Sequence, residues 1–239
     1  MTLSNYHAIS FDCFGTLVDW ESGIINALRN ASDDKLELVS DAQLIACFLK
    51  QESTILADAP GIPYPVALGK TYASILAELE KPCDTIQAMR FGSSVGEWPI
   101  FNDTIKALAY LQRHHKLIIL SNIDDASIEA TKTRLLCNFY RTYTAQAIGS
   151  FKPALNNFDY LVRHLEELGI KKQELLHVSV SRFHDIEPAA VTGIDTVWIN
   201  RANTLNGTLS IQAEFSPSIE PTYKFRSLAE MVNEHKAGY

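Results

Sequence analysis

Four short apolar runs stand out along the chain, and each has the character of a strand buried on both faces. They are rich in aliphatic residues and do not alternate strictly between apolar and polar positions, as expected of a parallel sheet covered on both sides. The runs are residues 8–11, 117–120, 175–180 and 196–199. Because helical patterns separate them, we predict an α/β fold with an open parallel sheet and right-handed crossovers.

The helical patterns between these runs have apolar stripes and polar residues suited to capping. Ile105, Leu108 and Leu111 share one stripe, and Asn102 or Asp103 can cap that helix. The helices predicted in this part of the chain are residues 103–115, 124–136, 156–168 and 227–235.

The segment from about residue 20 to residue 98 differs from the rest because it contains no strand-like run. Its patterns predict helices over residues 23–34, 41–59 and 67–80. We therefore predict two domains, a sheet-containing core of residues 1–19 and 99–239 and an all-helical insert of residues 20–98. The stretch 203–225, late in the core, reads as turn-rich.

Composition and charge narrow the classes of partner. The 239 residues are 46% hydrophobic and 21% charged, with a formal net charge of −7. No basic stripe suited to nucleic acid is visible, and no apolar run is long enough to span a membrane. The four cysteines match neither a metal spacing nor a disulfide framework. We expect a cytoplasmic protein with a small-molecule substrate and no nucleic-acid or membrane partner, and a homodimer is compatible with its helical faces.

Polar residues that can carry chemistry follow the predicted strands. Ligands bind at the carboxyl ends of strands in an open parallel sheet, so these side chains are expected to converge on one cleft. Lys152 adds a positive charge from a loop ahead of a helix that Pro153 can start. Taken singly, each of these residues could be a turn or cap residue. The residues that follow the strands are Asp12, Ser121, Asn122, Ser181, Arg182, His184 and Asp185.

The sequence "FDCFGT", the "LSN" at 120–122, the lysine of "SFKP" and the acid of "SRFHD" resemble the four motifs of the haloacid dehalogenase superfamily. The continuations "GTLVDW", "GSFKP" and "TVWINR" are similar to its L-2-haloacid dehalogenase branch. The resemblance implies a Rossmann-like core with a helical cap inserted after the first motif. It also implies that Asp12 is a nucleophile, which forms a covalent ester that water then cleaves.

The same resemblance implies roles for the other motif residues. Thr16, Ser121 and Asn122 would hydrogen-bond the nucleophile or a substrate carboxylate. Lys152 would place a positive charge beside the nucleophile and keep it ionised. Asp185 would orient that lysine or help to position the hydrolytic water.

Phe14 separates the chemistries found within the superfamily. Phosphatases carry a second aspartate two residues after the nucleophile, and it protonates the leaving alcohol. Phe14 cannot donate a proton, whereas halide needs none to leave. We therefore expect a hydrolase that acts on a small 2-substituted carboxylic acid, as 2-haloacid dehalogenases do. The alternatives are a phosphatase with Mg²⁺ and a specialised or non-catalytic protein of the same fold that acts on or binds a larger metabolite. No acid follows Asp185 at a spacing of three to five residues, so we favour a mechanism without a metal or other cofactor.

The chain departs from the dehalogenase pattern at groups that bind substrate. No arginine occurs between Ala31 and Met89, where the cap arginine that receives the halide is expected. Lys50 is the cationic candidate there, although a solvated helix lysine reads the same way. The position of a family tyrosine, six residues after the lysine, is Phe158.

The fourth motif also differs from the Ser-Ser-Asn that precedes a Trp-Asp pair in the family. Counting back from Asp185 gives Val180, Ser181 and Arg182, so the arginine takes the place of the asparagine. Arg182 then either binds a substrate carboxylate or halide or points to solvent. His184 either shuttles protons or makes a structural hydrogen bond.

Overall fold

The computed structural model describes residues 2–59, 62–201 and 219–238 and divides the chain into two compact units. The first, here called the sheet unit, comprises Met1–Val18, Ile100–Asn122 and Lys132–Tyr239. The second, the helical unit, comprises Asp19–Pro99 and Ile123–Thr131. The helical unit thus includes a short segment after the second strand that the sequence patterns did not assign to it.

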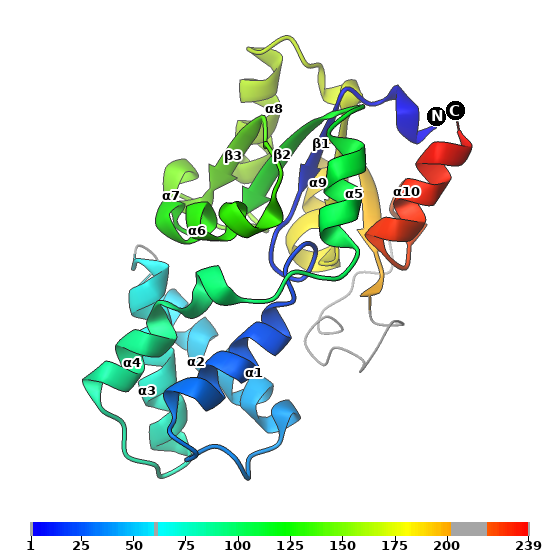
Figure 1. Ribbon diagram of the computed structural model, residues 1–239. Helices are drawn as coiled ribbons and strands as arrows, with labels where there is room; N and C mark the ends of the chain where they lie inside the picture. Colours follow the sequence, from blue (N-terminus) through cyan, green and yellow to red (C-terminus); the bar gives the residue numbers. More distant parts are fainter. Residues whose placement is uncertain (1, 60–61, 202–218, 239) are drawn as a thin grey trace. The chain divides into compact units, whose positions relative to one another are not determined.

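A six-stranded parallel sheet with the order β3-β2-β1-β4-β5-β6 organises the sheet unit, and Figure 1 labels β3, β2 and β1 side by side. β1 lies at the centre, where Phe11 pairs with Ile119 on one side and with Val178 on the other. This arrangement confirms the predicted α/β fold class. The strands are β1 (Ala8–Phe11), β2 (Lys116–Ser121), β3 (Arg141–Thr144), β4 (Leu175–Ser179), β5 (Asp195–Ile199) and β6 (Tyr223–Phe225).

The sequence patterns missed the two edge strands. β3 reads "RTYT" and β6 reads "YKF", and both are partly exposed, as edge strands commonly are. Neither has the aliphatic run by which the four inner strands were found. β6 falls within the stretch predicted to be turn-rich, so that prediction was wrong for 223–225, and residues 203–218 lie outside the described part of the chain.

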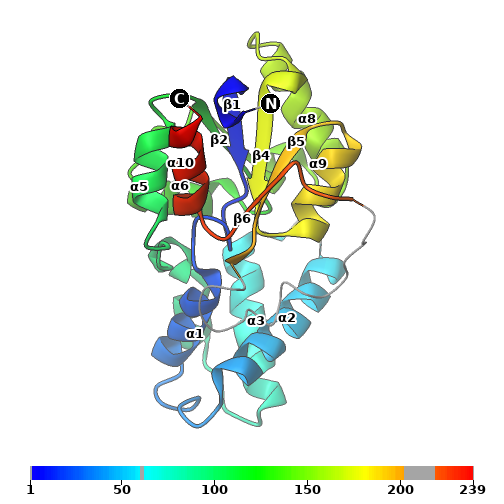
Figure 2. The ribbon, with the colours of Figure 1, turned by 90° about the vertical axis from the view of Figure 1, so that its right-hand side faces the viewer.

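Helices cover both faces of the sheet. Figure 2 shows α5 and α10 on one face and α8 and α9 on the other. On the second face, Phe158, Leu161 and Leu165 of α8 pack with Ile118 and Leu175 of the sheet in one buried cluster. Burying each such side chain contributes about 1.5–3 kcal/mol. The helices of this unit are α5 (Thr104–Leu111), α7 (Ala145–Ile148), α8 (Asn156–Glu166), α9 (Glu187–Val191) and α10 (Leu228–Ala237), and the short η1 (Leu3–Asn5) and η3 (Lys172–Glu174) precede β1 and β4.

Some predicted details of these helices differ. Ile105 is 38% exposed, and Thr104 is buried in the stripe beside Leu108 and Leu111. Asp103 precedes α5 but does not cap it, because its carboxylate accepts from the Leu228 N–H of α10, 2.8 Å away, and from Arg201. α8 begins at Asn156, as the pattern over residues 156–168 predicts, and not at Pro153.

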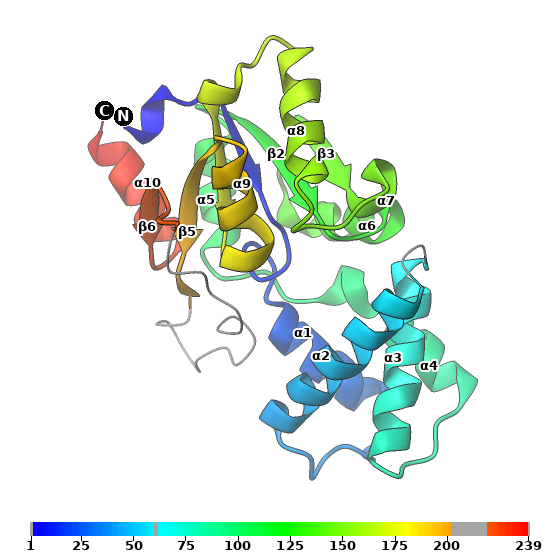
Figure 3. The ribbon, with the colours of Figure 1, turned by 180° about the vertical axis from the view of Figure 1, so that it is seen from behind.

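The helical unit contains four main helices, seen from behind in Figure 3. α2 begins with a full capping box between Ser40 and Gln43. The core is aromatic, with Tyr72 stacked on Phe91 at 5.6 Å and Phe48 beside that ring. Its elements are α1 (Trp20–Ala31), α2 (Asp41–Asp58), α3 (Tyr64–Glu78), α4 (Thr85–Gly92), the short η2 (Ser94–Glu97) and the start of α6 (Asp125–Leu135), which continues into the sheet unit.

The short α4 was not predicted from the sequence. It has only eight residues, and Ile86 and Met89 on it are exposed, so its apolar pattern does not mark a buried face. Across the described part of the chain, no helix combines the length and the apolar character that crossing a membrane requires.

Candidate active site

The first strand delivers Asp12 to the carboxyl edge of the sheet. Its N–H donates to the Val178 carbonyl at 3.1 Å, so the β1–β4 ladder holds its backbone. The chain then turns through Gly15, whose φ of +95° falls in the left-handed region that favours glycine. This turn brings Thr16 back, and its hydroxyl donates to Asp12 Oδ2 at 2.8 Å and accepts from the Val180 N–H at 3.1 Å. One oxygen of the carboxylate is therefore fixed by the loop that follows it.

Lys152 joins the two acids. Its Nζ lies 2.9 Å from Asp12 Oδ1, 2.5 Å from Asp185 Oδ1 and 3.0 Å from the Leu120 carbonyl oxygen. These three acceptors match the three donors of an ammonium group. The side chain is only 2% exposed, so these contacts form out of water.

Asn122 acts on the backbone of the same lysine. Its Nδ2 donates to the Lys152 carbonyl at 2.9 Å, and its Oδ1 accepts from the Lys152 N–H at 2.7 Å. This paired contact places the lysine loop against the end of β2. The sequence predicts that this amide bonds the nucleophile or a substrate carboxylate, and the contacts seen in the structure are with the Lys152 backbone.

Asp185 is held by three side chains. Its Oδ1 accepts from Lys152 and from His177 Nε2 at 3.0 Å, and its Oδ2 accepts from Ser179 Oγ at 3.0 Å. The carboxylate is fully buried, since the residue is 1% exposed. The sequence patterns missed His177 and Ser179. The available signal was that two polar residues interrupt an otherwise apolar strand.

A π-helical turn spans Arg182–Ile186 within the fourth motif. Ser179, six residues before Asp185, supplies the hydroxyl that donates to this acid. The Arg182 guanidinium lies 5.2 Å from the Trp198 ring centroid and donates to the Ile219 carbonyl, so it contacts β5 and the segment before β6.

The remaining predicted residues have varied surroundings. Ser121 is buried at the end of β2 and pairs with Thr144 of β3. Phe14 is partly buried in the loop after β1, where it forms a bridge with Val18. His184 Nδ1 lies 3.1 Å from Ser181 Oγ, which is the structural hydrogen bond considered above.

Lys50 lies in the helical unit, on α2. Its Nζ is 2.8 Å from Glu78 Oε1 of α3, and its side chain is 65% exposed. The contact is an ordinary surface ion pair between two neighbouring helices. This geometry favours the solvated reading of Lys50 over a halide-binding one.

The buried charges shift one another's titration. Burial raises the pKa of Asp12, and the Asp185 charge adds to that rise while Lys152 and Thr16 oppose it. Burial acts on Asp185 in the same direction, but Lys152 and His177 outweigh it and hold the pKa of Asp185 well below its usual range. The two acids keep the pKa of Lys152 raised despite its burial. Two carboxylates beside one cation thus have separated pKa values, a pattern typical of active sites.

The residues present do not fit a Mg²⁺ ion shared by Asp12 and Asp185. The Lys152 ammonium already bridges these two carboxylates, and Thr16 and Ser179 donate to their other oxygens. Over the ranges that the structure describes, no three His, Cys, Asp or Glu side chains are grouped to hold a metal ion.

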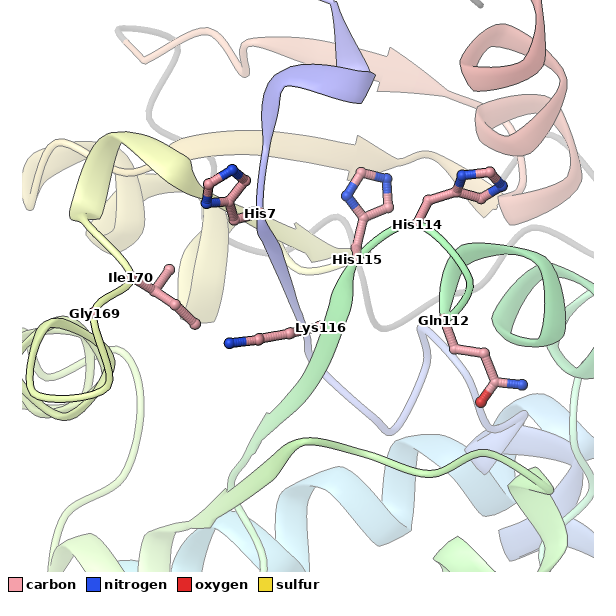
Figure 4. Close-up of a pocket in the computed structure, with 7 residues that line it drawn as sticks. All are labelled: His7, Gln112, His114, His115, Lys116, Gly169 and Ile170. Carbon is pink, nitrogen blue, oxygen red and sulfur yellow. The ribbon is translucent and has the colours of Figure 1, made fainter.

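A second polar cluster lies at the opposite ends of the same strands. His115, directly before β2, donates from Nδ1 to the Tyr6 carbonyl at 2.7 Å, and its Nε2 lies 2.7 Å from His235 Nε2 of α10. Tyr110 Oη is 3.1 Å from His235 Nδ1. Figure 4 shows His115 beside His7 and Lys116 in the lining of a cavity of about 400 Å³. We call Tyr110, His115 and His235 the amino-end cluster, and Asp12, Lys152 and Asp185 the carboxyl-end cluster.

The amino-end cluster is satisfied without any charge. Since the Tyr6 carbonyl can only accept, neutral His115 has its proton on Nδ1 and accepts at Nε2. His235 then donates from Nε2 and accepts the Tyr110 hydroxyl at Nδ1. Burial lowers the pKa of His115 and lowers that of His235 to about 4, which agrees with this neutral arrangement.

Comparison with known proteins agrees with the fold and the motifs. Residues 6–191, more than half of the chain, match the family of haloacid dehalogenase-like hydrolases. No curated protein matches the sequence significantly.

Solved structures similar to the sheet and helical units include two L-2-haloacid dehalogenases. One, PA0810, has a TM-score of 0.81 at 18% identity, covering 98% of this chain and 100% of its own. The other, from Xanthobacter autotrophicus, has a TM-score of 0.75 at 19% identity, covering 98% and 100%. A HAD-hydrolase from Bacillus subtilis, YfnB, whose structure is bound to magnesium, has a TM-score of 0.74 at 18% identity, covering 97% and 99%. At these identities the likeness shows a shared fold.

Proposed function

The chain belongs to the haloacid dehalogenase-like hydrolases, and from this membership we propose that it hydrolyses small 2-substituted carboxylic acids with Asp12 as the nucleophile. In the first step a carboxylate oxygen of Asp12 attacks C2 of the substrate, and the leaving group departs with the bonding electron pair. In the second step water attacks the carbonyl carbon of the resulting ester. The acyl–oxygen bond breaks, Asp12 is regenerated, and a 2-hydroxy acid and a proton are released.

The contact that carries this proposal is the Lys152 ammonium, 2.9 Å from Asp12 Oδ1. A buried carboxylate would otherwise tend to take up a proton, and only its ionised form is a nucleophile. Thr16 holds the second oxygen, so the carboxylate is oriented before substrate arrives, and Lys152 favours its ionised form. Preorganisation of this kind reduces the entropic cost of the attack.

The residue two positions after Asp12 supports a leaving group that needs no proton. Phe14 is partly buried in the loop after β1 and cannot act as an acid. Halide is such a leaving group, whereas an alkoxide from a phosphate ester is not. The lysine bridge between Asp12 and Asp185 further supports a reaction without Mg²⁺.

The three donors on Asp185 support an orienting role for this acid. A carboxylate that already accepts from Lys152, His177 and Ser179, and whose pKa is held low, is a weak base toward the hydrolytic water. Its proposed task is to hold Lys152 against Asp12.

The test is a screen for halide and phosphate release over substrate panels, with added Mg²⁺ and with EDTA. The expected result is halide release from a 2-haloacid, unchanged by EDTA. A single turnover in H₂¹⁸O should place ¹⁸O in the Asp12 peptide, because water attacks the ester carbonyl. Phosphate release that depends strictly on Mg²⁺, or ¹⁸O that appears only in the product, would overturn the proposal.

A further inference from the structure

His177 is a buried histidine within β4 that the proposed reaction does not yet use. It is fully buried, and its Nε2 lies 3.0 Å from Asp185 Oδ1 while its Nδ1 lies 2.8 Å from Ser10 Oγ of β1. Phe158 packs edge-to-face on the imidazole with a centroid distance of 5.3 Å. The ring is therefore fixed by two hydrogen bonds and one aromatic contact, between the central strand and the carboxyl-end cluster.

The surroundings define which nitrogen carries the proton. An ionised Asp185 can only accept, so Nε2 must be protonated. In the neutral ring Nδ1 then accepts from the Ser10 hydroxyl, for which the alternative acceptor, the Leu176 carbonyl, is 3.4 Å away. The other neutral tautomer would turn a lone pair toward the carboxylate, which is unfavourable in a buried site.

We infer that His177 is a positioning residue: it fixes Asp185 Oδ1, the oxygen that holds Lys152 Nζ against Asp12. The inference rests on the proposed role of Asp12 as nucleophile. The chain of contacts is short and continuous, running from His177 Nε2 through Asp185 Oδ1 to Lys152 Nζ and Asp12 Oδ1, with steps of 3.0, 2.5 and 2.9 Å. Without the histidine, Asp185 retains Ser179 and Lys152 but can rotate, and the ammonium follows it.

Two substitutions separate positioning from core packing. The Nε2 of glutamine can reach the place of His177 Nε2, whereas the Nδ2 of asparagine reaches the place of Nδ1. We expect His177→Gln to keep kcat within about 5-fold of the wild type, and His177→Asn to lose about 30-fold or more in kcat with little change in KM. His164→Asn on α8, where the native imidazole bonds the Tyr160 carbonyl, is the matched control and should leave kcat unchanged. Equal losses in the glutamine and asparagine variants, or losses that follow Tm, would overturn the inference.

Two measurements need no turnover and so separate this inference from the proposed function. In ¹⁵N-histidine NMR spectra we expect a protonated Nε2 on His177, and an Nδ1–H tautomer with a bare Nε2 would overturn the inference. In ¹³C NMR titrations of the Asp12 carboxyl group, His177→Asn should move the midpoint to higher pH and His177→Gln should not, because Lys152 stays in place only in the latter. An unmoved midpoint in His177→Asn would overturn the inference even if the wild type released halide.

Discussion

The carboxyl-end and amino-end clusters occupy opposite ends of the same parallel strands, and both consist of buried titratable groups. They differ in charge. The carboxyl-end cluster contains two carboxylates and one ammonium and so carries a formal charge of −1 when all three are ionised. The amino-end cluster contains two histidines and a tyrosine whose hydrogen bonds are matched with every group neutral.

This difference fits the proposed reaction at the carboxyl-end cluster and a stabilising role for the amino-end cluster. Burying an ion costs free energy unless an opposite charge pairs with it. With two carboxylates and only one ammonium, one carboxylate is less well paired than the other. The compensated partner is Asp185, whose pKa is held low, and the uncompensated one is Asp12, whose pKa burial raises. Proteins retain a destabilising buried charge of this kind where a reaction needs the charged group. The amino-end cluster has no such group, and we expect it to anchor α10 to the start of β2.

Removing the proposed nucleophile is the largest change that this comparison predicts. Asp12→Asn should lower kcat by roughly 10⁴-fold or more, since the other carboxylate of the cluster, Asp185, is fully buried and already accepts from three side chains. The fold should persist. Because the folded state raises the pKa of Asp12, the neutral amide should also raise Tm at pH 7, and the gain should shrink as the pH falls through that raised pKa. Halide assays and thermal melts from pH 4 to pH 8 measure both effects. Retained halide release in pure Asp12→Asn protein would contradict the assignment.

Removing the shared cation is the next largest change. Lys152→Met leaves two buried carboxylates side by side and should cost about 3–5 kcal/mol in the free energy of unfolding. Activity should fall by roughly 10²-fold or more, and the acid limb of kcat/KM should move to higher pH because Asp12 loses the charge that keeps it ionised.

If that variant unfolds, the double variant Lys152→Met/Asp185→Asn removes the repulsion and should recover most of the stability without recovering activity. Recovery of activity in the double variant would show that the ammonium does not serve the nucleophile.

Disrupting the amino-end cluster should alter stability and leave catalysis alone. His235→Leu removes the partner of His115 and of Tyr110, which should cost about 1–3 kcal/mol at pH 7.5 while kcat/KM stays within about 3-fold. The wild type should lose stability as the pH falls from about 6.5 toward 4. Over that range the unfolded chain takes up a proton that folded His235, with its pKa of about 4, does not. The gap between variant and wild type should therefore close at low pH. A gap that stays constant from pH 7.5 to pH 4.5 would argue against the neutral arrangement.

The sequence was enough to predict the inner strands of the sheet but not its edge strands. The inner strands and their terminal residues were predictable because aliphatic runs ending in an acid or a hydroxyl are a local signal, and the structure brings Asp12, Lys152 and Asp185 together. The edge strands β3 and β6 lack that signal, since a strand with one neighbour need not be apolar.

Other features of the site could not be predicted, because they depend on contacts that the spacing of residues along the sequence does not show. Ser179 was not singled out because it lies inside the run counted as a strand, and its hydrogen bond to Asp185 appears only in the fold. His177 lies inside an apolar run and was counted only as part of a strand. The amide of Asn122 could bind either substrate or backbone, and only the fold decides that it clamps Lys152.

The smallest predicted effect concerns a solvent-exposed ion pair in the helical unit, in contrast to the two buried clusters. Lys50 and Glu78 form an ion pair at 2.8 Å with the lysine side chain 65% exposed. Solvent and salt screen such pairs, so they contribute little to stability. Lys50→Ala should therefore leave the free energy of unfolding nearly unchanged and leave KM for a 2-haloacid within about 2-fold.

Glu78→Gln is the matched control because it breaks the same pair and keeps the cation. If the pair is only structural, both variants should lose the same small stability, the loss should fade in about 0.5 M salt, and neither should change KM. If Lys50 received the halide in place of the missing arginine, Lys50→Ala would raise KM by about 10-fold or more, whereas Glu78→Gln would leave KM unchanged or lower it. The sign of the difference in KM between these two variants therefore decides whether the helical unit supplies the anion site through Lys50.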